Sequence, residues 1–350
     1  STLVVNSGLV KNDSANNAAK GIYAYAIDLL TNGNLGDVTA TINGGEVIST
    51  NYMAIRQFVN GDSCKNTLNV NGGTIKGATR GINIQLKNNA AYTNITGGKI
   101  EGGDYSLCFL TTSENLSVTG GEFKGSVWYS GTDGFISGGT FDERFDDAYC
   151  AEGYVTVKNS DGTFGVKVGE YTVRNTDTGF GYETLADALA AVLNGDNTIV
   201  LLKDNAENVI VKQTEGVNIV IDGQNHLYTG TITIHGSARY TGEETLTIQN
   251  MEFVTSNAGH YFIDSNSTAS AERYAHNVTV KDSTFTATGA GRNSAVAMRI
   301  RQGFDIAIEN VTASNMHSLF QGYGCDGLTV DNVTVSGKNG IAVGTSKNLE

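Results

Sequence analysis

The stretch NGGTIKG at residues 71–77 places two adjacent glycines before a short run of alternating polar and β-branched residues. The same figure recurs four more times in the N-terminal half of the chain, at intervals of 18 to 28 residues. An alternating run stands on each side of every pair, so we expect a tight corner between two strands there. The second glycines of the five pairs are Gly45, Gly73, Gly98, Gly121 and Gly139.

The C-terminal part of the chain repeats this pattern with Asn or Asp in the place of the first glycine. Examples are VTVKDSTF at 278–285 and IAIENVTA at 306–313. Asn and Asp tolerate a left-handed backbone, and side chains stacked at one corner can hydrogen-bond to one another. The equivalent corner residues are Asn250, Asp282, Asn310 and Asn332.

The repeating unit has two or three short strands and no helix, so one copy cannot bury an apolar face alone. Copies stacked in parallel and in register form a continuous core. The chain has 44 glycines and no proline, which suits strands paired on both sides because proline cannot donate to the ladder. We therefore predict an all-β protein with the fold of a right-handed parallel β-helix.

The glycine-pair repeat stops after Phe141. The next run, YVTVKNSDGTFGVKV at 154–168, alternates on both sides of an Asn-Ser-Asp-Gly turn and predicts a β-hairpin. After Thr184, apolar residues recur at helical spacing. This pattern predicts a short capping helix at about 183–194 with Thr184 as its N-cap.

Three regions follow from these signals. We predict a first parallel β-helix over 1–147, a hairpin seam over 148–180, and a second parallel β-helix over 181–350 with the capping helix at its start. Neither end of the chain carries a comparable cap, so we expect a segment of a longer multidomain protein.

The composition narrows the classes of partner. A net charge of -13 argues against nucleic acid, which requires a basic surface. The four cysteines lack metal-ligand spacing and predict neither a zinc site nor a disulfide framework. No apolar run of roughly 18 residues occurs, so we expect no membrane insertion by this segment. The chain opens without a charged and apolar leader, so any signal peptide is absent or removed.

Polar residues on consecutive coils of the second array are candidates for chemistry. Arg299 and Arg301 alternate with apolar residues and should point outward, and the insert at 264–276 could wall a groove beside them. The candidate catalytic residues are Asp264, Arg299, Arg301 and His317, with His260, Gln321 and Tyr323 beside them. The paired acids of a glycoside hydrolase are not evident, so solvated faces of a solenoid are the alternative interpretation.

Aromatic and cationic residues of the first array suggest a surface for sugar rings. Alternation sends one of Trp128 and Tyr129 inward, so packing in the core is the alternative for these rings. The candidate ligand-binding residues are Trp128, Tyr129, Arg56 and Tyr323, with Tyr23, Tyr25 and Asn83 nearby. The acidic run FDERFDDAY at 141–149 could hold calcium, but it lacks the spacing of a calcium loop, so we expect a solvated acidic loop and no cofactor.

The motifs SGGTFD (137–142), YCAEGYVTVKNSDGTFGV (149–166) and YETLADALAAVLNGDNTIVLLKD (182–204) resemble the Gly-Gly-x-Phe repeat proteins of bacterial cell surfaces. These are adhesin-like relatives of the pectate-lyase-like right-handed β-helix superfamily. The resemblance implies secretion, multidomain architecture and an extracellular, cell-surface location. We therefore expect an adhesin or stalk that binds a glycan or host ligand. The alternative is a polysaccharide lyase or glycoside hydrolase on the same scaffold.

Overall fold

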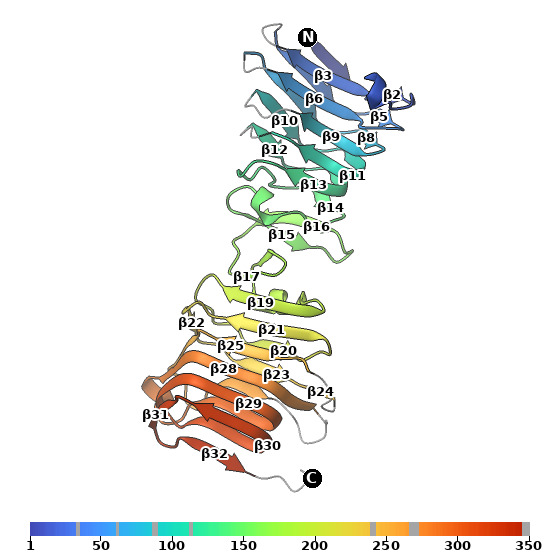
Figure 1. Ribbon diagram of the computed structural model, residues 1–350. Coiled ribbons are helices and arrows are strands. Elements are labelled where there is room, and N and C mark those ends of the chain that lie inside the picture. The colour runs from blue at the N-terminus through green and yellow to red at the C-terminus, as the bar shows by residue number, and fades with distance from the viewer. Residues whose placement is uncertain are drawn as a thin grey trace. The chain divides into compact units, whose positions relative to one another are not determined.

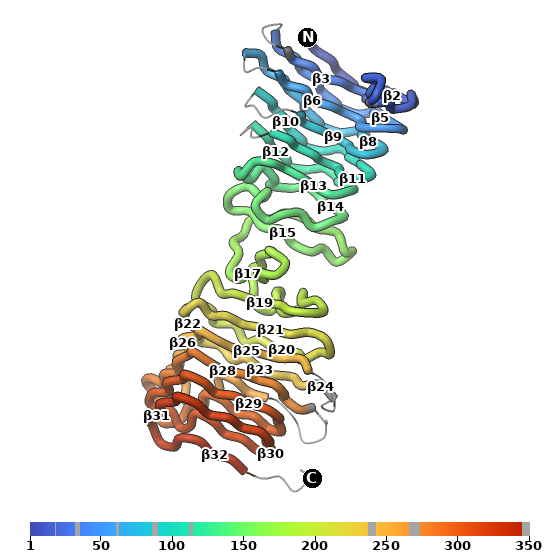
Figure 2. The backbone as a smooth tube through the Cα atoms, in the orientation of Figure 1, coloured from blue at the N-terminus to red at the C-terminus, as the bar shows by residue number. Residues whose placement is uncertain are grey.

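The computed structural model describes residues 1–344 except 33–35, 61–62, 86–89, 112–114, 239–242 and 266–272. Strands hold 59% of the chain and helix almost none, and the strands build a parallel β-solenoid of about 12 turns, so the predicted fold class is confirmed. The chain divides into two compact units, Ser1–Glu170 and Tyr171–Glu350 (Figure 1). The backbone trace in Figure 2 shows coil following coil within each unit.

In the first unit each coil contributes a strand to three parallel ladders. Ladder 1 contains β1 (Thr2–Val5), β4 (Val38–Ile42), β7 (Asn66–Val70), β10 (Ala91–Ile95) and β12 (Leu116–Val118). Ladder 2 contains β2 (Leu9–Asn12), β5 (Glu46–Ser49), β8 (Thr74–Gly77), the start of β11 (Lys99–Phe109), the start of β13 (Glu122–Tyr129) and β14 (Thr140–Phe141). Ladder 3 contains β3 (Ile27–Asn32), β6 (Ile55–Asn60), β9 (Arg80–Gln85) and the ends of β11 and β13.

The predicted hairpin ends the first unit. Strands β15 (Tyr154–Lys158) and β16 (Phe164–Val168) pair antiparallel, and β16 also pairs antiparallel with β14. The boundary between the units falls after Glu170. The predicted seam at 148–180 is therefore shared: the hairpin belongs to the first unit, and β17 (Val173–Asn175) belongs to the second.

The second unit repeats the three ladders. Ladder 1 contains β19 (Gly195–Leu201), β21 (Val217–Asp222), β25 (Leu246–Gln249) and parts of the long strands β28 (Arg273–Ala287), β29 (Val296–Met316) and β30 (Ser318–Asp331). Ladder 2 contains β22 (Leu227–Tyr228), β26 (Glu252–Thr255), further parts of β28 and β29, and β31 (Thr334–Gly337). Ladder 3 contains β20 (Val209–Lys212), β23 (Ile232–His235), β27 (Tyr261–Ser265), the starts of β29 and β30, and β32 (Ile341–Gly344).

The capping helix is present but shorter than predicted. Helix α1 spans Leu185–Ala190, and the Thr184 side chain accepts a 3.0 Å hydrogen bond from the Asp187 backbone N–H, as an N-cap does. It follows the short antiparallel pair β17 and β18 (Gly181–Tyr182) and packs against β17 to β20. The helix stops at Ala190 because Ala191 closes the last turn, whereas the predicted end was at about residue 194.

The glycine pairs occupy the corners between ladders 1 and 2, and the two glycines serve different needs. A Cβ at Gly72 would lie 2.7 Å from the Asn43 carbonyl oxygen on the preceding coil. Gly73 has a φ of 82°, a conformation that side chains disfavour. The five second glycines all have positive φ: Gly45 (76°), Gly73 (82°), Gly98 (89°), Gly121 (111°) and Gly139 (105°).

The corners of the second unit are made differently. There the left-handed residue is the Asn or Asp itself, at the place of the first glycine: Asn250 (49°), Asp282 (50°), Asn310 (53°) and Asn332 (47°). The predicted side-chain stack is also present. The Asn310 amide donates to Asp282 Oδ1 at 2.9 Å and accepts from the Asn332 amide at 2.8 Å. One corner fold is thus reached by two backbone routes.

Each unit has its own core. Aromatic rings from ladder 2 stack inside each core. The ring centres of Phe123 and Phe141 lie 4.5 Å apart, as do those of Phe253 and Phe285. These are the apolar residues that close the repeated motif, and their stacking accounts for its final Phe. A buried polar pair also lies in the second unit, with His276 Nε2 3.0 Å from a Glu244 carboxylate oxygen.

Candidate functional site

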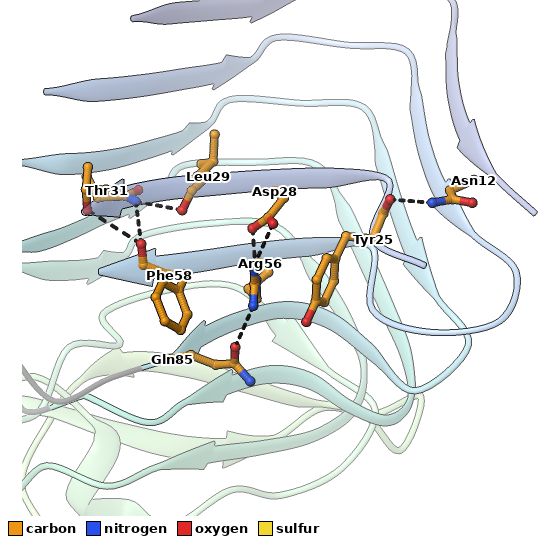
Figure 3. A network of polar contacts seen from close by, with 9 residues as sticks. Asn12, Tyr25, Asp28, Leu29, Thr31, Arg56, Phe58 and Gln85 are labelled. Atoms are coloured by element: carbon orange, nitrogen blue, oxygen red, sulfur yellow. Dashed lines mark hydrogen bonds and ion pairs between the residues drawn. The ribbon is translucent and has the colours of Figure 1, made fainter. Parts of the chain in front are cut away.

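Ladder 3 of the first unit carries a cluster of polar side chains that contact one another (Figure 3). Ile27 and Ile55 point into the core, so the next residue on each strand, Asp28 on β3 and Arg56 on β6, points outward. The two strands pair with Asp28 directly opposite Arg56. Parallel register therefore sets an acid beside a base on neighbouring coils.

Arg56 and Asp28 form a two-pronged ion pair. Arg56 Nε donates to Asp28 Oδ1 at 2.8 Å and Nη2 to Oδ2 at 2.6 Å, while Nη1 donates to Gln85 Oε1 at 3.3 Å (Figure 3). The guanidinium lies 4.3 Å from the centre of the Tyr25 ring. Partial burial lowers the pKa of Arg56, but hydrogen bonding to Asp28, aided by Tyr25, outweighs it and raises the pKa above its usual value. The guanidinium is thus a fixed, permanent cation.

Two further tyrosines pack on Tyr25 beside this pair. Tyr23 and Tyr25 stack with ring centres 5.8 Å apart, and Tyr52 lies 5.5 Å from Tyr25 and 6.1 Å from Tyr23. Tyr23 is 44% exposed. The cluster therefore presents an aromatic surface beside fixed hydrogen-bond donors and acceptors. We call Tyr23, Tyr25, Tyr52, Asp28, Arg56 and Gln85 the Arg56 cluster.

Other candidates of the first unit lie elsewhere along ladder 3. Asn83 is in register with Arg56 but is buried and accepts a 2.6 Å hydrogen bond from Arg80. Trp128 lies further along the same column and is 36% exposed, whereas Tyr129 is 5% exposed and packs on core aromatic rings. The alternation expected for these two rings is confirmed.

The second unit brings Asp264 and Arg299 together in the same way. They face each other in register on β27 and β29. Arg299 Nε donates to Asp264 Oδ1 at 2.8 Å and Nη2 to Oδ2 at 2.5 Å, and its guanidinium lies 3.7 Å from the centre of the Tyr261 ring. Hydrogen bonding to Asp264 raises the pKa of Arg299 above its usual value.

The remaining candidates of the second unit lie around this pair. Gln321 is in register with Arg299, and its amide lies 3.2 Å from His317 Nδ1. Arg301 is exposed and in register with Tyr323, which is 52% exposed. His260 lies on the coil of Asp264 and contacts the Gly230 carbonyl oxygen at 3.3 Å. Partial burial lowers the pKa of His260, so the imidazole is neutral near pH 7. Most of the insert proposed as a groove wall, 266–272, lies outside the described residues.

This geometry is poorly suited to catalysis by Arg299 and Asp264. A general base must give up its proton to accept another, and the ion pair stabilises the protonated guanidinium. The Asp264 carboxylate is likewise engaged by two donors of Arg299. The pair is better suited to recognising a polar ligand by hydrogen bonds.

The acidic loop at 141–149 uses its carboxylates within the fold. Asp147 is buried, pairs with Arg144 at 3.0 Å and accepts from Thr156 at 3.1 Å, which differs from the solvated loop expected. Asp146 caps a short 3-10 turn at Asp147–Tyr149. Within the described ranges, no three His, Cys, Asp or Glu side chains are grouped so as to hold a metal ion.

Three members of the Arg56 cluster, Asp28, Tyr52 and Gln85, were not among the sequence candidates, nor was Tyr261 beside Arg299. Each acquires its place only through pairing with another coil. A usable signal was the recurrence of Tyr-x-Ile-Asp at 25–28 and 261–264.

Comparison of the chain with protein-family models, curated proteins and solved structures yields no match in any of the three. In the part of the chain that the structure describes, no helix has the length and apolar character needed to cross a membrane.

Proposed function

We propose that this chain is a segment of a secreted bacterial cell-surface protein in which the β-solenoid displays a glycan-binding surface. The surface location and secretion rest on the resemblance of the repeats to cell-surface Gly-Gly-x-Phe proteins. The binding role rests on the Arg56 cluster.

The observation that supports this role most directly is the packing of Tyr25 on Arg56 of the Arg56–Asp28 pair, with Tyr23 and Tyr52 packed on Tyr25. A sugar ring offers C–H faces that pack on aromatic rings and hydroxyls that both donate and accept hydrogen bonds. Arginine supplies only donors and ionised aspartate only acceptors, so the pair matches neighbouring hydroxyls. Exposed Tyr23 supplies the ring at the edge of the cluster.

A polysaccharide lyase or hydrolase is the second candidate, because the groups at Asp264 and Arg299 also lie on outward strand positions. Their mutual ion pair favours binding over turnover, as argued above. The two functions differ in a direct measurement: an enzyme releases new chain ends, whereas a binding protein retains its polysaccharide intact.

The test is affinity electrophoresis of the full chain in gels containing galactomannan, xylan or pullulan, and, as an acidic counterpart, polygalacturonate. Reducing ends and unsaturated uronate absorbance are measured on the same mixtures. We expect retardation by a neutral polysaccharide without product, and weaker retardation in Tyr23→Ala. The matched control is Tyr92→Ala, because Tyr92 also lies under a cation, Lys65, but on ladder 1.

Retardation as strong in Tyr23→Ala as in the wild type would contradict the assignment of the cluster. The absence of retardation in every gel would contradict the binding function itself. Product from any polysaccharide would favour the enzyme.

A further inference from the structure

The same set of side chains occurs once in each unit, on ladder 3. Tyr25 stands three residues before Asp28, and Tyr261 stands three residues before Asp264. On the following coil, Met-Ala-Ile-Arg at 53–56 corresponds to Val-Ala-Met-Arg at 296–299. Both arginines are thus the first outward residue after a buried Ala and a buried Ile or Met.

The two sets also agree in geometry. In each, Nε and Nη2 of the arginine bind the two oxygens of the aspartate on the preceding coil, at 2.8 and 2.6 Å in one unit and at 2.8 and 2.5 Å in the other. In each, the guanidinium lies on the tyrosine ring, at 4.3 Å and at 3.7 Å. The third coil differs between the units: Gln85 accepts from Arg56 but lies opposite Phe58, whereas Gln321 lies opposite Arg299 and contacts His317.

The solenoid does not need this set to hold its coils together. At the same column of ladder 3, other coils carry Ile210, Thr233, Cys108 and Ala342, and their strands pair in register all the same. A partly exposed ion pair adds little to stability. The recurrence of the Tyr, Asp and Arg side chains in one geometry is therefore a property of the outward surface.

An exposed tyrosine contacts the set in the first unit, and another lies opposite Arg301 on the next coil in the second unit. Tyr23 stacks on Tyr25 in the first unit. In the second unit Tyr323 lies two positions beyond Gln321 on β30, and both side chains alternate with inward residues and point outward. Tyr23 is 44% exposed and Tyr323 is 52% exposed.

We propose that the chain carries two copies of one site, Tyr25–Asp28–Arg56 and Tyr261–Asp264–Arg299, each of which binds a neutral glycan. This rests on the proposed glycan-binding function and names its ligand class and its number of sites. The glycan is neutral because each guanidinium is already matched by a carboxylate, and because a chain of net charge -13 repels polyanions. Tyr25 and Tyr261 position the arginines, and Tyr23 and Tyr323 stack on the sugar.

The test is calorimetric titration of the full chain with a tetrasaccharide prepared from whichever neutral polysaccharide retards it. We expect a stoichiometry of two in the wild type, one in Tyr23→Ala, one in Tyr323→Ala, and no binding in the double variant. Tyr92→Ala retains two. Both substituted tyrosines are exposed, and the unchanged thermal transition of each variant verifies folding.

A stoichiometry of one in the wild type, or an unchanged titration in Tyr323→Ala, would overturn the duplicated site while leaving glycan binding by the first unit intact. Stronger retardation by polygalacturonate than by the neutral polysaccharides would overturn the ligand class. Absence of binding to all of them would overturn the proposed function, so the failures are distinguishable.

Discussion

The corner at Gly72 and Gly73 allows a direct test of why the motif contains two glycines. Gly72→Ala places a Cβ 2.7 Å from the Asn43 carbonyl oxygen without a positive φ. Gly73→Ala places one 2.7 Å from the Gly45 carbonyl oxygen and also forces alanine into a φ of 82°. Gly162→Ala, in the hairpin turn, is the matched control: its φ is 89°, and its Cβ would meet nothing within 4 Å.

The three substitutions separate two costs. A left-handed alanine costs about 1–2 kcal/mol, and replacing glycine recovers about 0.4–1 kcal/mol through the unfolded chain. Overpacking against a backbone atom costs about 1–3 kcal/mol. We therefore expect losses of roughly 1 kcal/mol for Gly162→Ala, 1–2 for Gly72→Ala and 3 for Gly73→Ala, by combining these terms.

The assay is urea denaturation of the full chain followed by tryptophan fluorescence. Trp128 is the only tryptophan of the chain and belongs to the first unit, as do all three glycines, so the signal reports the unit that carries the substitutions. Equal destabilisation by Gly73→Ala and Gly162→Ala would show that the approach of the neighbouring coil carries no energetic weight. The steric explanation of the glycine pair would then be refuted.

Three further outcomes are expected. Asn310→Gly keeps the left-handed backbone and loses the side-chain bonds, at about 0.5–1.5 kcal/mol, whereas Asn310→Ala adds about 1–2 kcal/mol of strain; scanning calorimetry resolves the difference. Glu244→Ala removes the carboxylate that bonds to buried His276 and lowers the stability of the second unit by about 1–3 kcal/mol, and Glu244→Gln by less, in denaturant unfolding followed by circular dichroism. Hydrogen bonds from Lys99 and a second lysine lower the pKa of Glu101 from 4.5 to about 2. The contribution of ionised Glu101 to the free energy of unfolding is therefore complete above pH 4.5 and is lost as the pH falls towards 2. Both lysines are exposed, so the loss is about 0.5 kcal/mol, and Glu101→Gln should flatten the acid limb of the stability profile by that amount.

The fold was predictable because its determinants are local. Each glycine pair and each corner asparagine adopts its conformation through its own φ and the coil directly below, and both recur in the sequence at coil spacing. The N-cap at Thr184 and the hairpin turn are also local. The end of α1 was misplaced because Val192, although partly buried against the core, lies beyond the last helical turn. An apolar residue at helical spacing does not by itself extend a helix.

The site was predictable only in part because it depends on register between coils. Arg56 was identified as a candidate ligand-binding residue, but its partner Asp28 lies 28 positions earlier across a segment of irregular length. The number of residues between coils does not determine which outward residues face each other, since loops of different length leave the same core. Asp264 and Arg299 were both candidates, yet their mutual neutralisation was visible only in the structure.

The two units reach the same outward set from different corners. In the first unit the coils that carry Asp28 and Arg56 turn from ladder 1 to ladder 2 at Gly8 and Gly45, with φ of 85° and 76°. In the second unit the coil that carries Arg299 makes this turn at Asp282, with a φ of 50°. The residue types at these ladder 3 positions are therefore not determined by one kind of corner, since the corners contain glycine in the first unit and Asn or Asp in the second. Nor does pairing impose them, because other coils hold Thr or Ala in the same column. What the Tyr, Asp and Arg side chains have in common is their outward direction, and this is the arrangement that the proposed shared ligand requires.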